Sequence, residues 1–223
     1  MSSPVVQAGL RAGGMDAAQT FKDPQAVALV RAIEQEDMPA IDLAIQRGAK
    51  INTVGEAGQT PLHWSLLKVG ISVATVQHLL ARGADPNAPL HNGKSPLFLT
   101  SGSNRPDLLE LFLQHRGNPN VLNTIQETPL MNAIASQYEI NVRLLLKFGA
   151  DPNLGETCLS TVGAGRFDMT VDLLISGLTK DLVRCGRLVS TTVTMNDPAR
   201  QAARSKVFEL LAGRGVHAPF AER

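Results

Sequence analysis

The sequence predicts an all-α protein of about five stacked helix–turn–helix repeats, with capping helices at both ends. A Thr-Pro-Leu or Ser-Pro-Leu opening recurs at residues 60–62, 95–97 and 128–130, so successive openings are 35 and 33 residues apart. A second motif that closes on Asn recurs at residues 48–52, 83–87, 116–120 and 149–153. Apolar pairs lie between the two motifs, late in each predicted second helix. Self-similarity at such a period is typical of repeat proteins, in which each unit contacts its neighbours.

Composition supports a folded chain with an aliphatic core. The 223 residues are 43% hydrophobic and 18% charged, which excludes disorder along the whole chain. Because only 4% are aromatic, the core has to come from Leu, Val, Ile and Ala. The 21 basic and 20 acidic residues leave a net charge of +1, which argues against a general nucleic-acid or membrane-surface binder. No apolar run approaches the roughly 18 residues that a membrane span needs.

The beginning of the chain is expected to be a flexible leader over residues 1–20, without the features of a secretory signal. Residues 21–223 are predicted to form a single domain. Its first unit, 23–57, lacks the Thr-Pro-Leu opening but contains two helical stretches, about 24–36 and 39–47, and is interpreted as an N-terminal cap. As the sequence stands we expect a cytoplasmic protein, or a periplasmic one if an export signal has been trimmed or misassigned.

Local chemistry explains the motifs of the next repeats, predicted at about 58–92, 93–125, 126–154 and 155–178. Thr or Ser before Pro-Leu can cap a helix, and Pro is harmless at the first helical position. Gly after the second helix adopts a left-handed conformation at little cost, and Asp and Asn suit the turn that follows. The repeat at 58–92 carries two extra residues near 70–73, and the projecting loop is almost absent between Asn153 and Thr157.

The repeat markers vanish after Gly177, and residues 179–223 are predicted to form a C-terminal cap. Within it, Asp197-Pro-Ala opens a last amphipathic helix at 199–214. Its expected buried positions are Ala203, Val207, Leu210 and Leu211.

Recognisable catalytic signatures are missing: the chain has no G-x-S-x-G, H-E-x-x-H or G-x-x-x-x-G-K-[ST]. Cys158 and Cys185 are too few for a disulfide framework or a four-cysteine zinc site, so two buried thiols are favoured, with one disulfide as the alternative. The Gly-rich segment 163–167 lies where a helix–turn–helix joint needs glycine, which favours a turn over a phosphate loop. We therefore expect no enzymatic activity, no metal and no cofactor.

The two recurring motifs resemble those of the ankyrin repeat, a 33-residue unit marked by T-P-L-H and G-A-D-x-N, over roughly residues 23–177. The resemblance implies an elongated solenoid that binds other proteins on a concave face of projecting loops and first helices. It also implies a structural hydrogen-bonding role for His63. Trp64, next on the first helix, is expected either as an exposed binding anchor or as a half-buried core residue.

The phase of the repeat selects the expected partner-binding positions, before the openings and near the ends of the first helices. These positions are Glu56, Gln59, Trp64, Leu67, Lys68, Leu90, His91, Asn92, Lys94, Thr124, Ile125, Glu127 and Tyr138. Four of them (Leu67, Leu90, Ile125 and Tyr138) are apolar or aromatic, which favours a partly apolar binding strip. The free protein is expected to be a monomer without a nucleic-acid partner.

A narrower resemblance rests on Phe21-Lys-Asp-Pro24, Ala32-Ile33, Asp37, Gly58-Gln-Thr-Pro-Leu-His-Trp64, and the series Val207, Leu211, Gly215-Val216 and Pro219. These residues look like those of bacterial ankyrin proteins encoded beside antibacterial phospholipase effectors of type VI secretion, which are thought to be immunity proteins. The resemblance implies a protein that binds and inhibits such a lipase. The alternatives are a general ankyrin adaptor or scaffold and, least favoured, an enzyme regulated through its repeats.

Overall fold

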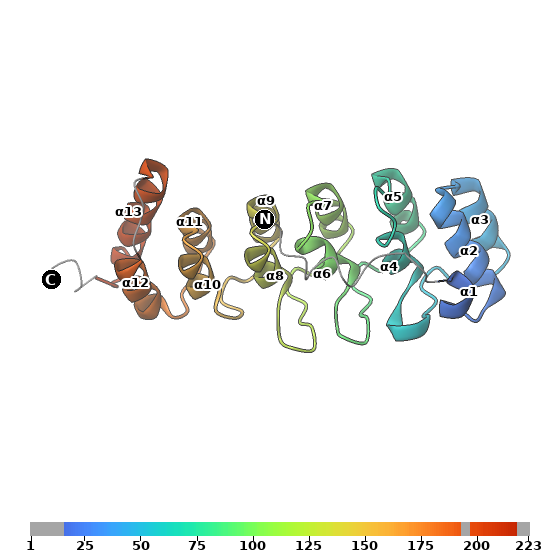
Figure 1. Cartoon of the computed structure of the whole chain (residues 1–223), viewed down its shortest axis with the longest axis horizontal. Helices are drawn as coiled ribbons and strands as arrows, with labels where there is room; N and C mark the ends of the chain where they lie inside the picture. The colour runs from blue at the N-terminus through green and yellow to red at the C-terminus, as the bar shows by residue number, and fades with distance from the viewer. Residues whose placement is uncertain (1–15, 193–196, 218–223) are drawn as a thin grey trace. The chain divides into compact units, whose positions relative to one another are not determined.

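The computed structural model describes residues 16–192 and 197–217 (Figure 1). Over these residues the regular structure is helical, with thirteen α-helices, one short 3-10 helix and no β-strand. The chain forms two compact units: residues up to 97 together with 114–117, and residues 98–113 together with those from 118 onward. The single domain predicted for residues 21–223 stays a prediction.

Two helix pairs make up most of the first unit (Figure 1). They are α2 (Pro24–Gln35) with α3 (Met38–Gln46), and α4 (Pro61–Ser65) with α5 (Val73–Ala81). Asp23 and Asp37 cap α2 and α3 by accepting backbone N–H bonds, and a proline follows each cap in the first turn. A side-chain cap satisfies an N–H that has no partner within the helix, so these Asp-Pro pairs explain where the helices begin.

A short helix, α1 (Ala17–Thr20), occupies the last four residues of the predicted leader. Ala17 and Phe21 are buried at 4% and 2% exposure in a cluster with side chains of α2 and α4. The structure therefore differs from the expected leader over residues 17–20, because this segment forms a helix that buries Ala17 and leads into the buried Phe21. Residues 1–15 of the predicted leader lie outside the described residues.

Two further helices, α6 (Pro96–Ser101) and α7 (Pro106–Gln114), contain residues of both units. The rest of the second unit consists of three helix pairs: α8 (Pro129–Ala135) with α9 (Glu139–Lys147), α10 (Thr157–Gly163) with α11 (Phe167–Ile175), and α12 (Leu182–Thr191) with α13 (Pro198–Ala212). In this unit α10 contacts α8 and α12, and α11 contacts α9 and α13 (Figure 1). The α12–α13 pair thus continues the alternation of the repeats although its sequence lacks their motifs.

The last helix, α13, agrees with the predicted amphipathic segment 199–214 to within two residues at its C-terminal end. Val207 and Leu211 are buried, whereas Ala203 and Leu210 are half-buried. Pro219, part of the narrower resemblance, lies outside the described residues. None of the helices in the described part of the chain has the length and apolar character needed to cross a bilayer.

The state of the two cysteines also differs from the favoured expectation of two free thiols. Cys158 of α10 and Cys185 of α12 form a disulfide, with their Cα atoms 5.9 Å apart. The sequence favours two buried thiols, with one disulfide as the alternative, and the structure has the disulfide because the packing of α12 on α10 brings the cysteines together. Both residues are indeed buried, at 2% and 0% exposure.

The closing Asn of each repeat motif joins that repeat to the next. Each Nδ2 group donates to a backbone carbonyl beyond the following second helix: Asn52 to Gly83 at 2.8 Å, Asn87 to Arg116 at 3.0 Å, Asn120 to Gly149 at 3.0 Å and Asn153 to Gly177 at 3.1 Å. The Oδ1 atom of Asn120 also accepts the N–H of Asp151 at 2.8 Å. One side chain thus fixes two backbone groups of its neighbour.

Replacing Leu145 in α9 by Ala should lower the free energy of unfolding by roughly 2–5 kcal/mol, because the side chain is fully buried and its removal leaves a cavity. Leu122→Ala is the matched control, since Leu122 is 46% exposed, and it should cost less than about 0.5 kcal/mol. Urea unfolding followed by circular dichroism measures both. A loss below about 1 kcal/mol for Leu145→Ala would exclude Leu145 from the core.

Replacing Asn120 by Ala should cost about 1–3 kcal/mol, because it removes both hydrogen bonds that the amide makes to the next repeat. Asn104→Ala, in the exposed turn before α7, is the control and should be nearly neutral. The same urea unfolding distinguishes them. Equal stability of the two variants would contradict a role for the Asn120 amide in joining repeats.

Candidate partner-binding surface

Two hairpin loops of the first unit are held by backbone hydrogen bonds. In residues 55–59 and in residues 90–94, the N–H of the first residue donates to the carbonyl of the last, at 2.7 and 3.1 Å. The N–H of His91 donates to the carbonyl of Ala57 at 3.0 Å, which joins the two loops. Gly58 permits this approach, because a Cβ atom there would lie 3.0 Å from the His91 nitrogen. The two loops therefore form one ordered surface.

Six of the predicted partner-binding residues lie in these loops. Glu56, His91 and Asn92 are exposed, and Gln59, Leu90 and Lys94 are half-buried. Solvent reaches all six positions, so they stay predicted contacts.

The imidazole of His63 hydrogen-bonds to the loop at residues 90–94, which is the structural role that the ankyrin resemblance implied. Its Nδ1 lies 3.2 Å from the backbone nitrogen of Thr60, and its Nε2 lies 3.4 Å from the carbonyl oxygen of Lys94. Because the Thr60 N–H can only donate and the Lys94 carbonyl can only accept, the ring is neutral with its proton on Nε2. Burial lowers the pKa of His63 to about 4, against the opposing effects of the Lys94 carbonyl and the Asp85 charge.

In the second compact unit, the hairpin at residues 122–127 is held by Asn123, a residue that is not among the predicted contacts. Asn123 is 2% exposed, and its Oδ1 accepts the N–H groups of Ile125 at 3.0 Å and Glu127 at 2.9 Å. Its Nδ2 donates to the Glu127 carboxylate at 2.9 Å. At the tip, Ile125 is 70% exposed and Thr124 is exposed. The Asn just before the tip was the available signal, since Asn readily bonds backbone groups two residues on.

Trp64 and Leu67 do not lie on this surface: the expectation that Leu67 contacts a partner is wrong, and for Trp64 the structure agrees with the core alternative. Both are 4% exposed. The Trp64 indole donates to the Glu34 carboxylate at 2.8 Å and meets the Phe21 ring edge-on, with centroids 5.8 Å apart. The reason is α1: once residues 17–21 fold against α2 and α4, the apolar face of α4 is covered.

Lys68 is half-buried and is already engaged with the preceding helix pair. Its Nζ lies 2.6 Å from Oε1 of Glu36, the left-handed residue that ends α2. The other Glu36 oxygen accepts from the backbone of Ser72 at 3.0 Å and from the hydroxyl of Thr75 at 2.9 Å. These hydrogen bonds lower the pKa of Glu36 to about 2, and the bond from Lys68 has the largest effect. The two extra residues near 70–73 thus lie in a loop that Glu36 holds.

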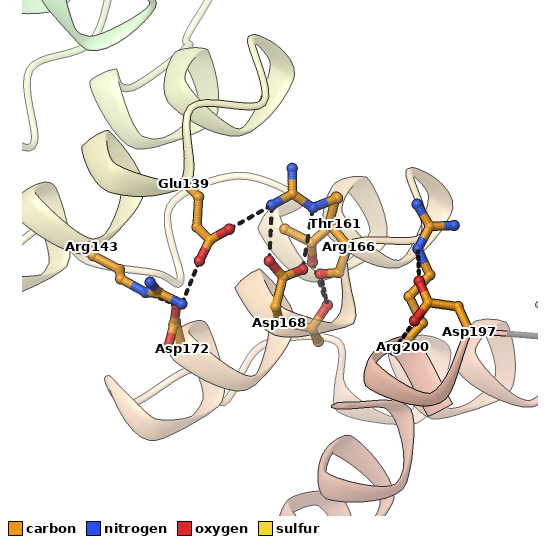
Figure 2. Close-up of polar contacts among 9 residues, drawn as sticks. Glu139, Arg143, Thr161, Arg166, Asp168, Asp172, Asp197 and Arg200 are labelled. Carbon is orange, nitrogen blue, oxygen red and sulfur yellow. Dashed lines mark hydrogen bonds and ion pairs between the residues drawn. The ribbon is translucent and has the colours of Figure 1, made fainter. Parts of the chain in front are cut away.

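Tyr138, the last predicted contact, is half-buried just before α9. Beside it, Glu139 and Arg143 of α9 meet charged side chains at the start of α11 and along it (Figure 2). Arg166 lies 2.9 Å from Glu139, and Arg143 lies 2.9 Å from Asp172. Burial raises the pKa of Glu139, and Asp168 adds to this effect.

These carboxylates are paired with arginines rather than left free for acid–base chemistry. Asp168 accepts from Arg166 at 2.8 Å, and Asp197 lies 3.6 Å from Arg200 at the start of α13 (Figure 2). We interpret the pairing of Glu139 with Arg166 and of Arg143 with Asp172 as a link between the α8–α9 and α10–α11 helix pairs. Among the residues that the structure describes, no group of three or more His, Cys, Asp or Glu side chains could hold a metal ion.

Comparison with known proteins places repeats in the same segment. Residues 66–156 match the family model "Ankyrin repeats (3 copies)". A putative ankyrin repeat protein, L271, of Acanthamoeba polyphaga mimivirus is 26% identical over 66% of this chain and 18% of its own length. The transient receptor potential channel pyrexia of Drosophila melanogaster is 32% identical over 52% of this chain and 12% of its own length. Ankyrin repeat and SOCS box protein 16 of Mus musculus is 29% identical over 58% of this chain and 30% of its own length.

These matches confirm the predicted all-α ankyrin-repeat fold. The chain spans less than a third of the length of each of these three relatives. Their names describe different proteins that share the repeat. The comparison therefore supports ankyrin repeats in this chain and identifies no binding partner.

Acidification should destabilise the protein through His63. The pKa of about 4 in the folded state lies below the usual histidine pKa of 6.5, so the unfolded chain binds the proton more tightly. The contribution is complete above pH 6.5 and is lost as the pH falls towards 4, by about 2 kcal/mol between pH 7 and pH 5. Urea unfolding at pH 7, 6 and 5 measures it.

His63→Asn is the control, because it lacks this titration and should show a shallower loss of stability over the same range. Identical pH dependence in wild type and variant would contradict the neutral, buried state of His63.

Proposed function

We propose that this chain is a protein-binding module that binds and inhibits an antibacterial phospholipase effector of a type VI secretion system. Ankyrin repeats bind other proteins, which supports the general part of the proposal. The narrower part is supported by the resemblance to immunity proteins. Residues that carry it, Phe21 and Trp64, pack against each other in the first compact unit, so they belong to its buried core and not to the contact surface.

The observation that carries the proposal is the ordered hairpin tip at residues 122–127. Asn123 fixes the backbone of the tip in the free protein, so little conformational entropy is lost when the tip binds. The tip presents Leu122 at 46% and Ile125 at 70% exposure, and residues 122–126 carry no charge. An uncharged apolar projection suits an apolar cleft, such as the one through which a phospholipase admits acyl chains. Occupation of that cleft would exclude the substrate.

The disulfide supports a periplasmic site of action. Disulfides form and persist in oxidising compartments, including the bacterial periplasm, and are rare in the cytosol. The Cys158–Cys185 bond therefore favours the periplasmic alternative over the cytoplasmic one. The absence of catalytic activity and of a cofactor stays a prediction.

Ile125→Ala should weaken binding to the effector about tenfold, because it removes the apolar side chain from the tip. Ile175→Ala is the matched control: Ile175 is 66% exposed but lies on α11, away from the hairpin, and its replacement should leave affinity unchanged. Titration calorimetry with a type VI phospholipase effector measures the affinities, and phospholipid hydrolysis measures the inhibition.

Wild-type protein should abolish hydrolysis at a stoichiometric ratio. Full lipase turnover in a several-fold excess of the protein would reject the immunity function and leave a general ankyrin adaptor. Inhibition that is equally sensitive to Ile125→Ala and Ile175→Ala would retain the immunity function but exclude the hairpin tip as the contact.

A further inference from the structure

We propose that the Cys158–Cys185 disulfide is a redox-controlled latch on the C-terminal cap. With the bond closed, α12 and α13 stay docked on α10 and α11, and reduction of the bond releases them. The proposal concerns the cap alone and stands independently of the identity of any partner.

The contacts of α12 show why a covalent bond matters there. Of its ten residues only Cys185, Gly186 and Val189 are buried, and one of these three is the cysteine itself. Asp181, which precedes the helix in a left-handed conformation, makes no side-chain cap. The ion pair from Arg184 to Glu156 is 3.6 Å long with both side chains 62% exposed, so it stabilises little. The disulfide therefore adds a covalent link to a helix that has two other buried residues.

The second cap helix depends on the first. Arg204 of α13 donates to the carbonyls of Val189 and Ser190 at 3.0 and 3.1 Å, in the last turn of α12. Arg214, after α13, donates to the carbonyl of Leu174 at the end of α11 at 2.6 Å. Release of α12 removes the carbonyl partners of Arg204, so α13 loses this polar attachment. The two helices should loosen together.

The chemistry is thiol–disulfide exchange with a dithiol reductant. One thiolate of the reductant attacks a sulfur of the Cys158–Cys185 bond and forms a mixed disulfide, and the second thiol then displaces the protein sulfur. The products are two protein thiols, which gain two electrons and two protons, and the oxidised reductant. Because both cysteines are at most 2% exposed, attack requires the packing around the bond to loosen locally while the two sulfurs are still joined. The rate of this local loosening thus limits the rate of reduction.

The experiment uses the whole chain after equilibration with oxidised glutathione and again after treatment with dithiothreitol. Titration under denaturing conditions should find no free thiol before reduction and two after it. Hydrogen–deuterium exchange should accelerate at least tenfold at the amides of α12 and α13 after reduction, with α2 and α3 unchanged. The thermal transition that involves the cap should move down by about 10 °C, the size expected when a bond across 27 residues is opened.

The Cys158→Ala/Cys185→Ala double variant is the matched control, because it should behave like the reduced wild type and ignore dithiothreitol. Reduction of the wild type leaves every side chain in place, so the test holds even if the double variant folds poorly. Two free thiols in the glutathione-treated protein would overturn the latch. Unchanged exchange in α12 and α13 after complete reduction would also overturn it.

Discussion

One asparagine amide per repeat is the interaction on which the stacking in each unit depends. An amide both donates and accepts, so Asn120 pairs at once with the carbonyl of Gly149 and the N–H of Asp151. Both groups lie where a second helix has ended and the chain turns, and there they have no partner within the helix. Because the same bond recurs from repeat to repeat, each repeat fixes the turn of the next. Hairpins and charged links are then built on helices whose register is already set.

The parts of the fold that the sequence predicts are those encoded by a few adjacent residues. Asp23 and Asp37 mark helix starts because an N-cap and the proline after it act within one turn. Thr60 with His63 forms a capping box on the same local scale. Because each local motif recurs at a fixed period, the sequence also predicts where the hairpins between repeats lie. Their exposed tips, such as Ile125, follow from the repeat phase alone.

The parts that could not be predicted depend on what covers a surface. Trp64 is buried because α1 folds over α4, and a four-residue helix is too short to leave a periodic pattern. The disulfide could be predicted only as an alternative for the same reason, since α12 has no repeat motif and only its packing brings Cys185 to Cys158. The pairing of Glu139 with Arg166 links residues 27 positions apart. Comparison of consecutive repeats would have suggested it, because equivalent positions of stacked repeats lie side by side.

The way Asn123 holds its hairpin separates the shape of the loop from its chemistry. The side chain of Asn123 bonds backbone groups of Ile125 and the backbone and carboxylate of Glu127, so the loop conformation makes no use of the Ile125 side chain. Position 125 can therefore accept other amino acids without refolding of the loop. Natural selection, or a randomised library displayed on this scaffold, could change the preferred ligand at that position at little cost in stability.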